Sequence, residues 1–379
     1  ASRFDEKGPL KGNDLLRNSL KLNLDHNITN KLSISANINT IFDKGNRSPI
    51  SGINPLYLLP WFTMYNEDGT PKKILGADVL SNTYQNPVYD LPFNSNITKS
   101  QQLVGVFSAK YKVFDWLTLS SNNSYNTSFT NTDNYEDRLS LTGAGDKGRL
   151  SQRRTSSNSF MTSNLITGRK QFGLHTVGGL GGFEYNQNNS EYNSLAVKNM
   201  PTGVKVPSAA SEVWNTGGKS FSGERFTRAS YSLFTEGNYS YDDRYFANAS
   251  YRMDYSTNFG IDNRAGHFYS LSGAWLASNE EFLRGSKYLT NLKLRASYGT
   301  NGKVAGEDFL TESFYNFNYQ YGGDPAAIIN QLGNRQITWE RAYVTNLGID
   351  LSLFNRINFS ADFYRKNNQD LLQRISVSS

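Results

Sequence analysis

The sequence contains no cysteine, and it has only three histidines, His26, His175 and His267. A chain without cysteine has no disulfide framework, no thiolate metal site and no cysteine nucleophile. The histidines are far apart and lack the paired spacing of a zinc site on one helix. The longest strongly apolar stretch, residues 56–62, is interrupted by Pro60. A helical membrane span needs ~18 continuous apolar residues, so we expect none here.

Charge is also scarce. Lysine and arginine number 39 against 33 aspartate and glutamate residues, which gives a net charge of +6, and charged residues make up 19% of the chain. Ordinary soluble domains carry roughly 25% charged residues. So small an excess of positive charge is weak evidence for nucleic-acid binding, and we expect no nucleic-acid partner. The basic pairs Lys72-Lys73 and Arg153-Arg154 are interpreted as solvated loop charges that meet anionic lipopolysaccharide.

Aromatic residues are abundant, at 13%, although the mean hydropathy is −0.57. Disordered chains are poor in aromatic and β-forming residues, so an ordered and half-polar structure is indicated. Transmembrane β-barrels can have a low mean hydropathy of this kind, because their polar interior offsets their apolar exterior. Residues 1–10 (ASRFDEKGPL) contain no apolar signal-peptide core, so we expect a mature chain, a truncated one or a piece.

Strict two-residue alternation recurs along the chain, which is the pattern of strands with two distinct faces. Over residues 357–364 the side chains alternate apolar and polar, and residues 347–353 repeat the pattern before the two-residue turn Asn355-Arg356. This predicts a β-hairpin. The same pattern predicts twelve strands, near residues 15–25, 31–42, 103–114, 117–129, 159–168, 174–186, 227–241, 245–255, 268–277, 291–299, 339–354 and 357–367.

These strands exceed the ~5 to 6 residues common in globular proteins and match the ~9 to 11 residues that cross a bilayer. Short and long connections alternate, as in outer-membrane barrels with short periplasmic turns and long outer loops. One inner connection, residues 278–290, begins with a capping-box pattern and predicts a short periplasmic helix. Interfacial aromatic residues flank the short turns: Trp116, Tyr241, Tyr245 and Phe354.

Strand parity places both ends of this sheet at the extracellular side. Complete bacterial barrels begin and end in the periplasm, so we expect further strands at each end. No repeat, proline-rich linker or block of like charges marks a second domain, so residues 1–379 are expected to be part of one all-β domain, an antiparallel transmembrane barrel.

No catalytic constellation emerges from the sequence, and we expect a non-enzyme without metal or cofactor. Asp242-Asp243 suits a turn better than a carboxylate pair, because adjacent strand-end residues point to opposite faces. The glycine cluster at residues 178–182 lacks the helix start and Lys-Ser/Thr of a phosphate loop. It is better explained as a strand whose glycines allow close backbone approach.

Transport would depend on polar side chains inside the barrel and on aromatic side chains in the long loops. Charges facing lipid at mid-depth cost ~2 to 4 kcal/mol for each Arg or Lys, so the alternation should turn them inward. The inward candidates are Glu236, Arg252, Asp254, Lys293, Arg295, Asp350 and Asp362. The loop candidates, whose rings could stack on sugars or grip peptides, are Tyr57, Trp61, Tyr65, Trp214, Tyr315, Tyr319 and Tyr321. The competing interpretation is structural, with wall charges paired to one another and loop rings packed together.

Several motifs resemble one known family. Residues 239–245 read YSYDDRY, 268–275 read FYSLSGAW and 291–299 read NLKLRASYG; further on, ITWE at 337–340, NLGID at 346–350, DFYRK at 362–366 and DLL at 370–372 keep the family's order and spacing. Together they resemble the barrel of the SusC/RagA-type TonB-dependent outer-membrane transporters. The match is specific over residues 227–372 and looser before them.

This resemblance implies a Gram-negative outer-membrane barrel of about 22 strands, a size that leaves a lumen needing a plug. It also implies an N-terminal plug region that contacts TonB and a SusD-like surface lipoprotein that closes over the barrel. The implied cargo is an oligosaccharide or, second, an oligopeptide.

Two other classes remain open at this stage. One is a passive pore or a barrel enzyme such as an outer-membrane phospholipase, complete at twelve strands. A phospholipase would need a Ser/His pair on its outer wall, and no nucleophile elbow is evident. The other is a soluble β-rich adhesin or glycan-binding module, which would be extracted without detergent.

Overall fold

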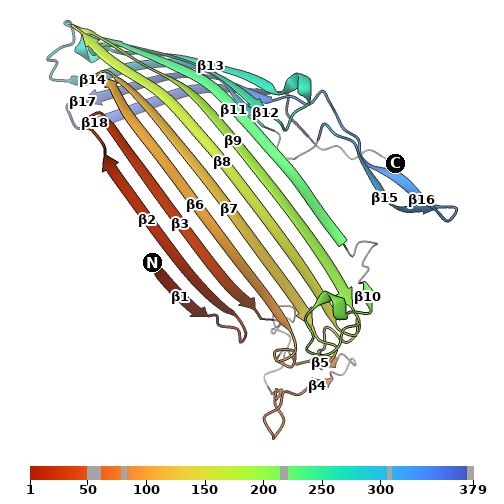
Figure 1. Cartoon of the computed structure of the whole chain (residues 1–379). Coiled ribbons are helices and arrows are strands. Elements are labelled where there is room, and N and C mark those ends of the chain that lie inside the picture. Colours follow the sequence, from red (N-terminus) through yellow and green to blue (C-terminus); the bar gives the residue numbers. More distant parts are fainter. Residues whose placement is uncertain (49–60, 78–82, 87, 214–220, 305–309, 374–379) are drawn as a thin grey trace.

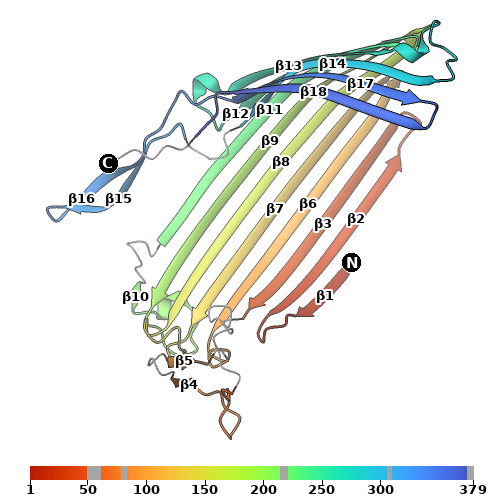
Figure 2. The same ribbon diagram turned by 180° about the vertical axis from the view of Figure 1, so that it is seen from behind.

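The chain forms one large curved antiparallel sheet. The computed structural model describes residues 1–48, 61–77, 83–86, 88–213, 221–304 and 310–373. Thirteen strands follow one another in chain order, from β1 at one edge to β18 at the other, and the short β10 (Glu212–Val213) pairs with β9 beside this path. Figures 1 and 2 show the sheet curling into a trough, with the last strands folded over toward one side.

The strands along the path are long. They are β1 (Ser2–Lys7), β2 (Asp14–Asn27), β3 (Leu32–Arg47), β6 (Ser95–Phe114), β7 (Leu117–Glu136), β8 (Arg149–Phe172), β9 (His175–Lys198), β11 (Phe221–Tyr241), β12 (Tyr245–Ser256), β13 (Ala265–Leu276), β14 (Leu289–Lys303), β17 (Glu340–Leu353) and β18 (Ile357–Gln369).

All twelve predicted strands are present, in the predicted order and antiparallel. The sequence pattern missed β1, because its residues are mostly charged or polar and Phe4 is its one large apolar side chain. It also stopped several strands too early. β8 and β9 each have 24 residues, which is ~79 Å of chain at ~3.3 Å per residue. Outside the apolar band, residues 151–158 of β8 are polar on both faces, and residues 186–194 of β9 nearly so, so the alternation that marks a strand is absent there.

The expected long loops contain structure of their own. In the segment expected as a loop over 300–338, β15 (Phe314–Tyr321) and β16 (Asp324–Gln331) form a hairpin that projects from the sheet (Figure 1). In the first long loop, β4 (Ile74–Ala77) pairs with β5 (Thr83–Gln85). No helix among the described residues has both the length and the hydropathy of a membrane span.

The tight turns use left-handed backbone. Asp242 and Asp243 have φ angles of 51° and 49°, which confirms the turn interpretation of this acidic pair. In the last hairpin the left-handed residues are Phe354 and Asn355, each at 55°, so the expected turn Asn355-Arg356 was wrong by one residue. Arg356 N donates to Leu353 O to close this turn.

The predicted periplasmic helix at 278–290 is also wrong. Only one 3-10 turn forms, Ala277–Asn279, because Glu280 leaves it in extended conformation, at φ −72° and ψ 148°. The Glu280 carboxylate accepts hydrogen bonds from Arg244 Nη1 (2.8 Å), Tyr245 Oη (2.6 Å) and Trp275 Nε1 (3.0 Å). Glu280, which lies inside the apparent capping pattern, therefore holds this connection against the sheet instead of continuing a helix.

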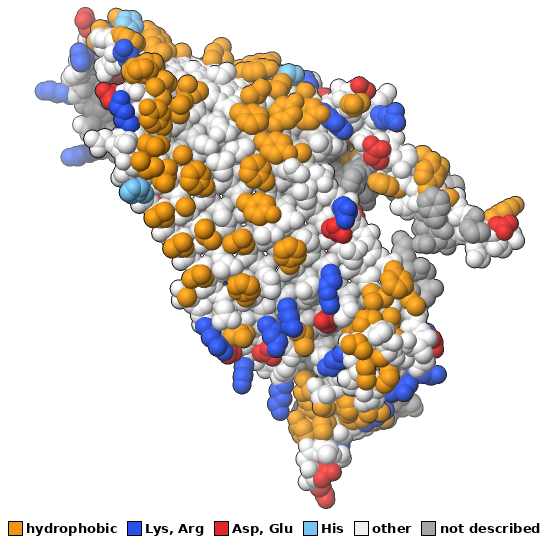
Figure 3. All heavy atoms as spheres, in the orientation of Figure 1, with side chains coloured by type: hydrophobic (Ala, Val, Ile, Leu, Met, Phe, Trp, Pro, Cys, Tyr) orange, Lys and Arg blue, Asp and Glu red, His pale blue; other side chains and the backbone are white. Residues whose placement is uncertain are grey.

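The convex face of the sheet carries most of the exposed large apolar side chains of the strands. Leu22, Leu271, Leu347 and Phe359 lie on it and are 53 to 62% exposed. Figure 3 shows hydrophobic side chains distributed across the middle of this face among small polar ones, with Lys and Arg toward both ends of the strands. Along β7 this band runs from Leu119 to Phe129, a distance of ~25 Å across the bilayer for a ~40° strand tilt, which matches the band of outer-membrane barrels.

Aromatic rings border the band at the short-turn end, as expected. Phe114 stacks on Trp116 with centroids 5.5 Å apart, Tyr241 lies 6.3 Å from Tyr245, and Phe354 packs edge-on at 5.6 Å against a neighbouring tyrosine. Such amphipathic rings settle at the headgroup level of a bilayer.

The glycine cluster lies in β9 and permits close contact, as predicted for Gly182. A Cβ atom there would lie 2.3 Å from the Phe234 ring and 2.7 Å from Leu165 Cδ2. Gly237, on the neighbouring strand, faces open space instead. The first glycine is therefore required by packing, and the second is not.

Candidate transport wall on the concave face

A row of small polar side chains crosses five strands of the concave face. Asn238, Asn248, Ser272, Ser297 and Asn346 lie directly opposite one another on β11, β12, β13, β14 and β17. In an antiparallel sheet, directly opposite residues share a face, so the register alone produces this polar ladder.

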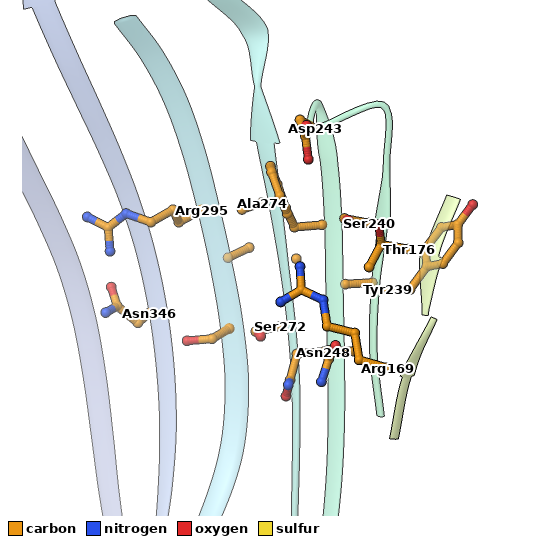
Figure 4. Close-up of a pocket in the computed structure, with 16 residues that line it drawn as sticks. Arg169, Thr176, Tyr239, Ser240, Asp243, Asn248, Ser272, Ala274, Arg295 and Asn346 are labelled. Atoms are coloured by element: carbon orange, nitrogen blue, oxygen red, sulfur yellow. The ribbon is translucent and has the colours of Figure 1, made fainter. Parts of the chain in front are cut away.

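The polar ladder lines a cavity of about 440 Å³, together with Arg169 from β8 and Arg295 from β14. Figure 4 shows the side chains of Arg169, Asn248, Ser272, Arg295 and Asn346 around this space. Asn346 Oδ1 is buried without a hydrogen-bond partner among the described residues. The cavity therefore offers amide, hydroxyl and guanidinium groups to a polar molecule.

Three of the inward candidates form one ion-paired cluster. Arg295 Nε donates to Asp350 Oδ2 at 2.8 Å, and its Nη2 lies 3.2 Å from Asp362 Oδ1. Asp350 also accepts a 2.7 Å hydrogen bond from Ser360 Oγ. Gly348, opposite both Arg295 and Asp362, leaves room for the arginine side chain, since a Cβ there would lie 2.8 Å from its guanidinium carbon.

Two more candidates form a second cluster nearer the long loops. Arg252 Nε donates to Asp254 Oδ1 at 2.6 Å, and its Nη2 donates to Ser232 Oγ at 2.8 Å and to Glu184 Oε2 at 3.1 Å. The guanidinium lies 5.0 Å from the Phe234 ring centroid. Glu184 was not among the predicted inward residues, although its place in the predicted strand 174–186 puts it on the polar face.

The remaining wall candidates, Glu236 and Lys293, form no ion pair among the described residues. Glu236 Oε1 accepts a 2.6 Å hydrogen bond from Asn248 Nδ2, which joins it to the polar ladder. Lys293 lies opposite Asp350, and its Nζ is 5.9 Å from the centroid of Phe246. Five of the seven inward candidates are thus ion-paired within the two clusters, and the neutral ladder lies between these clusters.

The loop aromatic residues are dispersed. Trp61 is 72% exposed. The Tyr65 hydroxyl accepts a hydrogen bond from Lys11 Nζ at 3.4 Å, and the Tyr65 backbone forms an antiparallel bridge with Pro71. Tyr315, Tyr319 and Tyr321 are exposed on the β15–β16 hairpin. Tyr57 and Trp214 lie outside the described residues. The structure does not bring these rings together with the charged wall residues.

At the outer ends of the strands, a compact network of hydrogen bonds joins several loops. This network was not predicted from the sequence. We define the loop lock as Asp90, Asn94, Tyr135, Asp137 and Gly203. Asp137 accepts from Tyr135 Oη (2.7 Å), Gly203 N (2.8 Å) and Leu139 N (2.9 Å), while Asn94 Oδ1 accepts from Asp137 N (2.9 Å). Asp90 accepts from Leu141 N at 2.7 Å. Three loops that are distant in sequence are joined in this way.

The contacts within the loop lock shift the pKa values of Tyr135 and Asp137. Burial raises the pKa of the Tyr135 hydroxyl to about 12, and the hydrogen bond to Asp137 adds to this shift. For Asp137, burial works against ionisation, but the donors from Leu139, Tyr135 and Gly203 together hold its pKa below the usual value. The carboxylate is therefore ionised in the folded protein and organises the three loops.

A second buried cluster lies at the long-loop ends of β13 and β17. Trp339, of the motif ITWE, packs against Phe259 at 4.9 Å and against Phe268 at 5.6 Å between ring centroids. All three rings are buried. The motif tryptophan is therefore a packing residue at the foot of the loops. Over the described part of the chain, no three His, Asp or Glu side chains gather as a metal site would require.

An apolar convex face, a polar concave face and strands that cross a bilayer define a transmembrane β-barrel wall of the outer-membrane type. Comparison with known proteins identifies the particular family. The family model "TonB dependent receptor-like, beta-barrel" matches residues 58–379, and the chain belongs to this family.

Curated relatives support this assignment. The chain is 26% identical over 388 residues to TonB-dependent receptor P26 of Formosa agariphila, an alignment that covers 99% of this chain and 38% of the relative. It is 33% identical over 123 residues to TonB-dependent receptor SusC of Bacteroides thetaiotaomicron, covering 30% of this chain and 12% of the relative. The chain thus spans less than two-fifths of these relatives' length. The SusC/RagA resemblance and the outer-membrane location are confirmed.

A solved structure has the same fold. The RagAB peptide transporter superimposes with a TM-score of 0.78 at 20% identity, covering 97% of this chain and 42% of that one. These relatives are named receptors and transporters, in line with the expectation of a non-enzyme. A soluble adhesin does not fit an outer-membrane barrel wall with this exposed convex face.

Proposed function

We propose that this chain forms part of the barrel wall of an energised nutrient importer. Substrate captured at the cell surface passes along the concave face, and TonB, acting through a plug region not contained in this chain, opens the path. A SusD-like surface lipoprotein closes the outer mouth of the barrel. Binding and gated passage, without bond chemistry, are the mechanism.

One observation carries this proposal: the wall charges pair with one another and leave a ladder of neutral amides and hydroxyls. Arg252 is held by Glu184 and Asp254, and Arg295 by Asp350 and Asp362. A wall of this kind offers many weak hydrogen bonds and little net charge. It suits a long, polar, mostly uncharged substrate that must be released again.

An oligosaccharide fits this surface best, and an oligopeptide is the second candidate. Hydroxyl-rich substrates exchange hydrogen bonds with Asn and Ser side chains as easily as with water. Because the structurally similar RagAB is named a peptide transporter, the experiment includes oligopeptides as well.

The experiment compares uptake of fluorescent oligosaccharides and oligopeptides by cells that express the full-length protein, with and without TonB. Import of one class that stops on TonB deletion supports the proposal. The variant Asn248→Leu/Asn346→Leu should slow import, while Asn30→Ala, at a short turn, should not. Uptake that continues undiminished without TonB would instead indicate a passive pore.

A further inference from the structure

Two lysines face each other on the convex surface. Lys44 of β3 and Lys99 of β6 are direct cross-strand partners and both are exposed. Like charges directly opposite in a sheet are destabilising. Neither ammonium has an ion pair or side-chain hydrogen bond among the described residues, so the protein itself does not offset this repulsion.

The lysine pair belongs to a row that continues across the sheet. Asn131 of β7 lies opposite Lys99, and Arg154 of β8 lies opposite Asn131. Arg154 is paired with Asp133 at 2.7 Å, and the other nearby acid, Asp14 of β2, lies opposite Asn46 rather than Lys44. We call Lys44, Lys99 and Arg154 the basic row, and it keeps a local excess of positive charge.

The basic row borders the apolar band at its outer edge. Phe42, Leu103 and Phe129 follow on the same face toward the membrane centre and are 40 to 50% exposed. Figure 3 shows this transition from hydrophobic side chains to Lys and Arg toward the long-loop end. The long loops face outward in outer-membrane barrels, so the basic row lies at the headgroup level of the outer leaflet.

We propose that the basic row binds the phosphate of an anionic lipid of the outer leaflet, whose acyl chains lie over Phe42, Leu103 and Phe129. Three features together favour a lipid over a free phosphate: the unpaired lysines, their depth at the edge of the band, and the continuous apolar surface beneath them. This site is separate from the concave wall, so the proposal of lipid binding does not depend on the proposed transport function.

The test is native mass spectrometry of the full-length protein in detergent, titrated with diphosphoryl lipid A and, separately, with zwitterionic phosphatidylethanolamine. Basic side chains near an anionic membrane surface contribute enough binding energy that Lys44→Gln/Lys99→Gln should weaken lipid A binding at least about tenfold. Inorganic phosphate added in excess should not displace the lipid, because it lacks the acyl contacts.

Two further variants separate binding from folding. Lys44→Glu places opposite charges across the strands, so the protein should fold at least as well while lipid A binding falls further. The matched control Lys110→Gln/Lys112→Gln removes two charges from the same strand, β6, at its short-turn end and on the concave face; its lipid binding should stay within about twofold of the parent. Equal lipid A affinity in the parent and Lys44→Gln/Lys99→Gln, or equal affinity for both lipids, would overturn the proposal.

Discussion

Replacing Asp137 by asparagine should open the loop lock while leaving the barrel folded. Asp137 is 2% exposed, and its carboxylate receives three hydrogen bonds, from Tyr135, Gly203 and Leu139. Hydrogen bonds to a charged group contribute ~1.5 to 3 kcal/mol. The substituted amide would keep one acceptor oxygen but would turn an N–H group toward the Gly203 amide, so we expect a local loss of about 2 kcal/mol.

Amide hydrogen exchange measures this loss directly. A local destabilisation of about 2 kcal/mol corresponds to roughly 30-fold faster opening-limited exchange at the amides of Leu139 and Gly203. Amides in the membrane band should keep their protection. The control Asp115→Asn, at an exposed short turn, should change local stability by less than about 0.5 kcal/mol. Unchanged exchange in Asp137→Asn would refute the loop lock.

The same lock should depend on pH. The pKa of Asp137 is lowered in the folded protein, so its stabilisation is complete above the unfolded value of about 3.9 and is lost as pH falls toward the folded value. Protease sensitivity of the three loops should therefore rise below about pH 4 in the parent but not further in Asp137→Asn. Tyr135→Phe should be non-additive with Asp137→Asn, because the two residues share a hydrogen bond.

Three further predictions concern the wall. Leu271→Arg places a charge on the lipid face and should cost ~2 to 4 kcal/mol in urea unfolding from vesicles, whereas Ser272→Arg, on the concave face, should cost much less. Gly182→Ala should lower the temperature of the heat-induced shift in gel mobility, because its Cβ would meet the Phe234 ring, while Gly237→Ala should not lower it. Glu280→Gln weakens the acceptor for Arg244, Tyr245 and Trp275, so the 277–288 connection should be cut faster by protease; equal cleavage would contradict its role.

The strand count could be predicted because the bilayer imposes a two-residue period over each crossing. The faces of Arg295 and Asp350 followed from the same period, and their register then brought them together. Where the period is absent, prediction failed: β1 is charged on both faces, and the outer parts of β8 and β9 carry polar side chains on both faces.

Side-chain contacts between residues that are distant in the chain could not be predicted from one sequence. Glu184 binds Arg252 across a distance of 68 residues, and the loop lock joins Asp137 to Gly203 across 66. The convex face also holds polar pairs that their polarity alone would place inward, such as Thr162 Oγ1 donating to Asn123 Oδ1 at 2.7 Å. In the structure these groups satisfy each other, which makes them tolerable on that face. The role of the wall and loop candidates in substrate binding stays a prediction.

Single-cysteine labelling along β13 tests the central claim most directly, because residues 1–379 contain no cysteine and the label therefore marks one site within this part of the barrel. Spin labels placed one at a time at residues 269–275 of the full-length protein in bilayers should report oxygen accessibility at 269, 271 and 273. Labels at 270, 272 and 274 should report accessibility to a water-soluble nickel reagent instead. Accessibility without this two-residue period, or with the two faces exchanged, would contradict a wall with lipid on one side and a polar passage on the other.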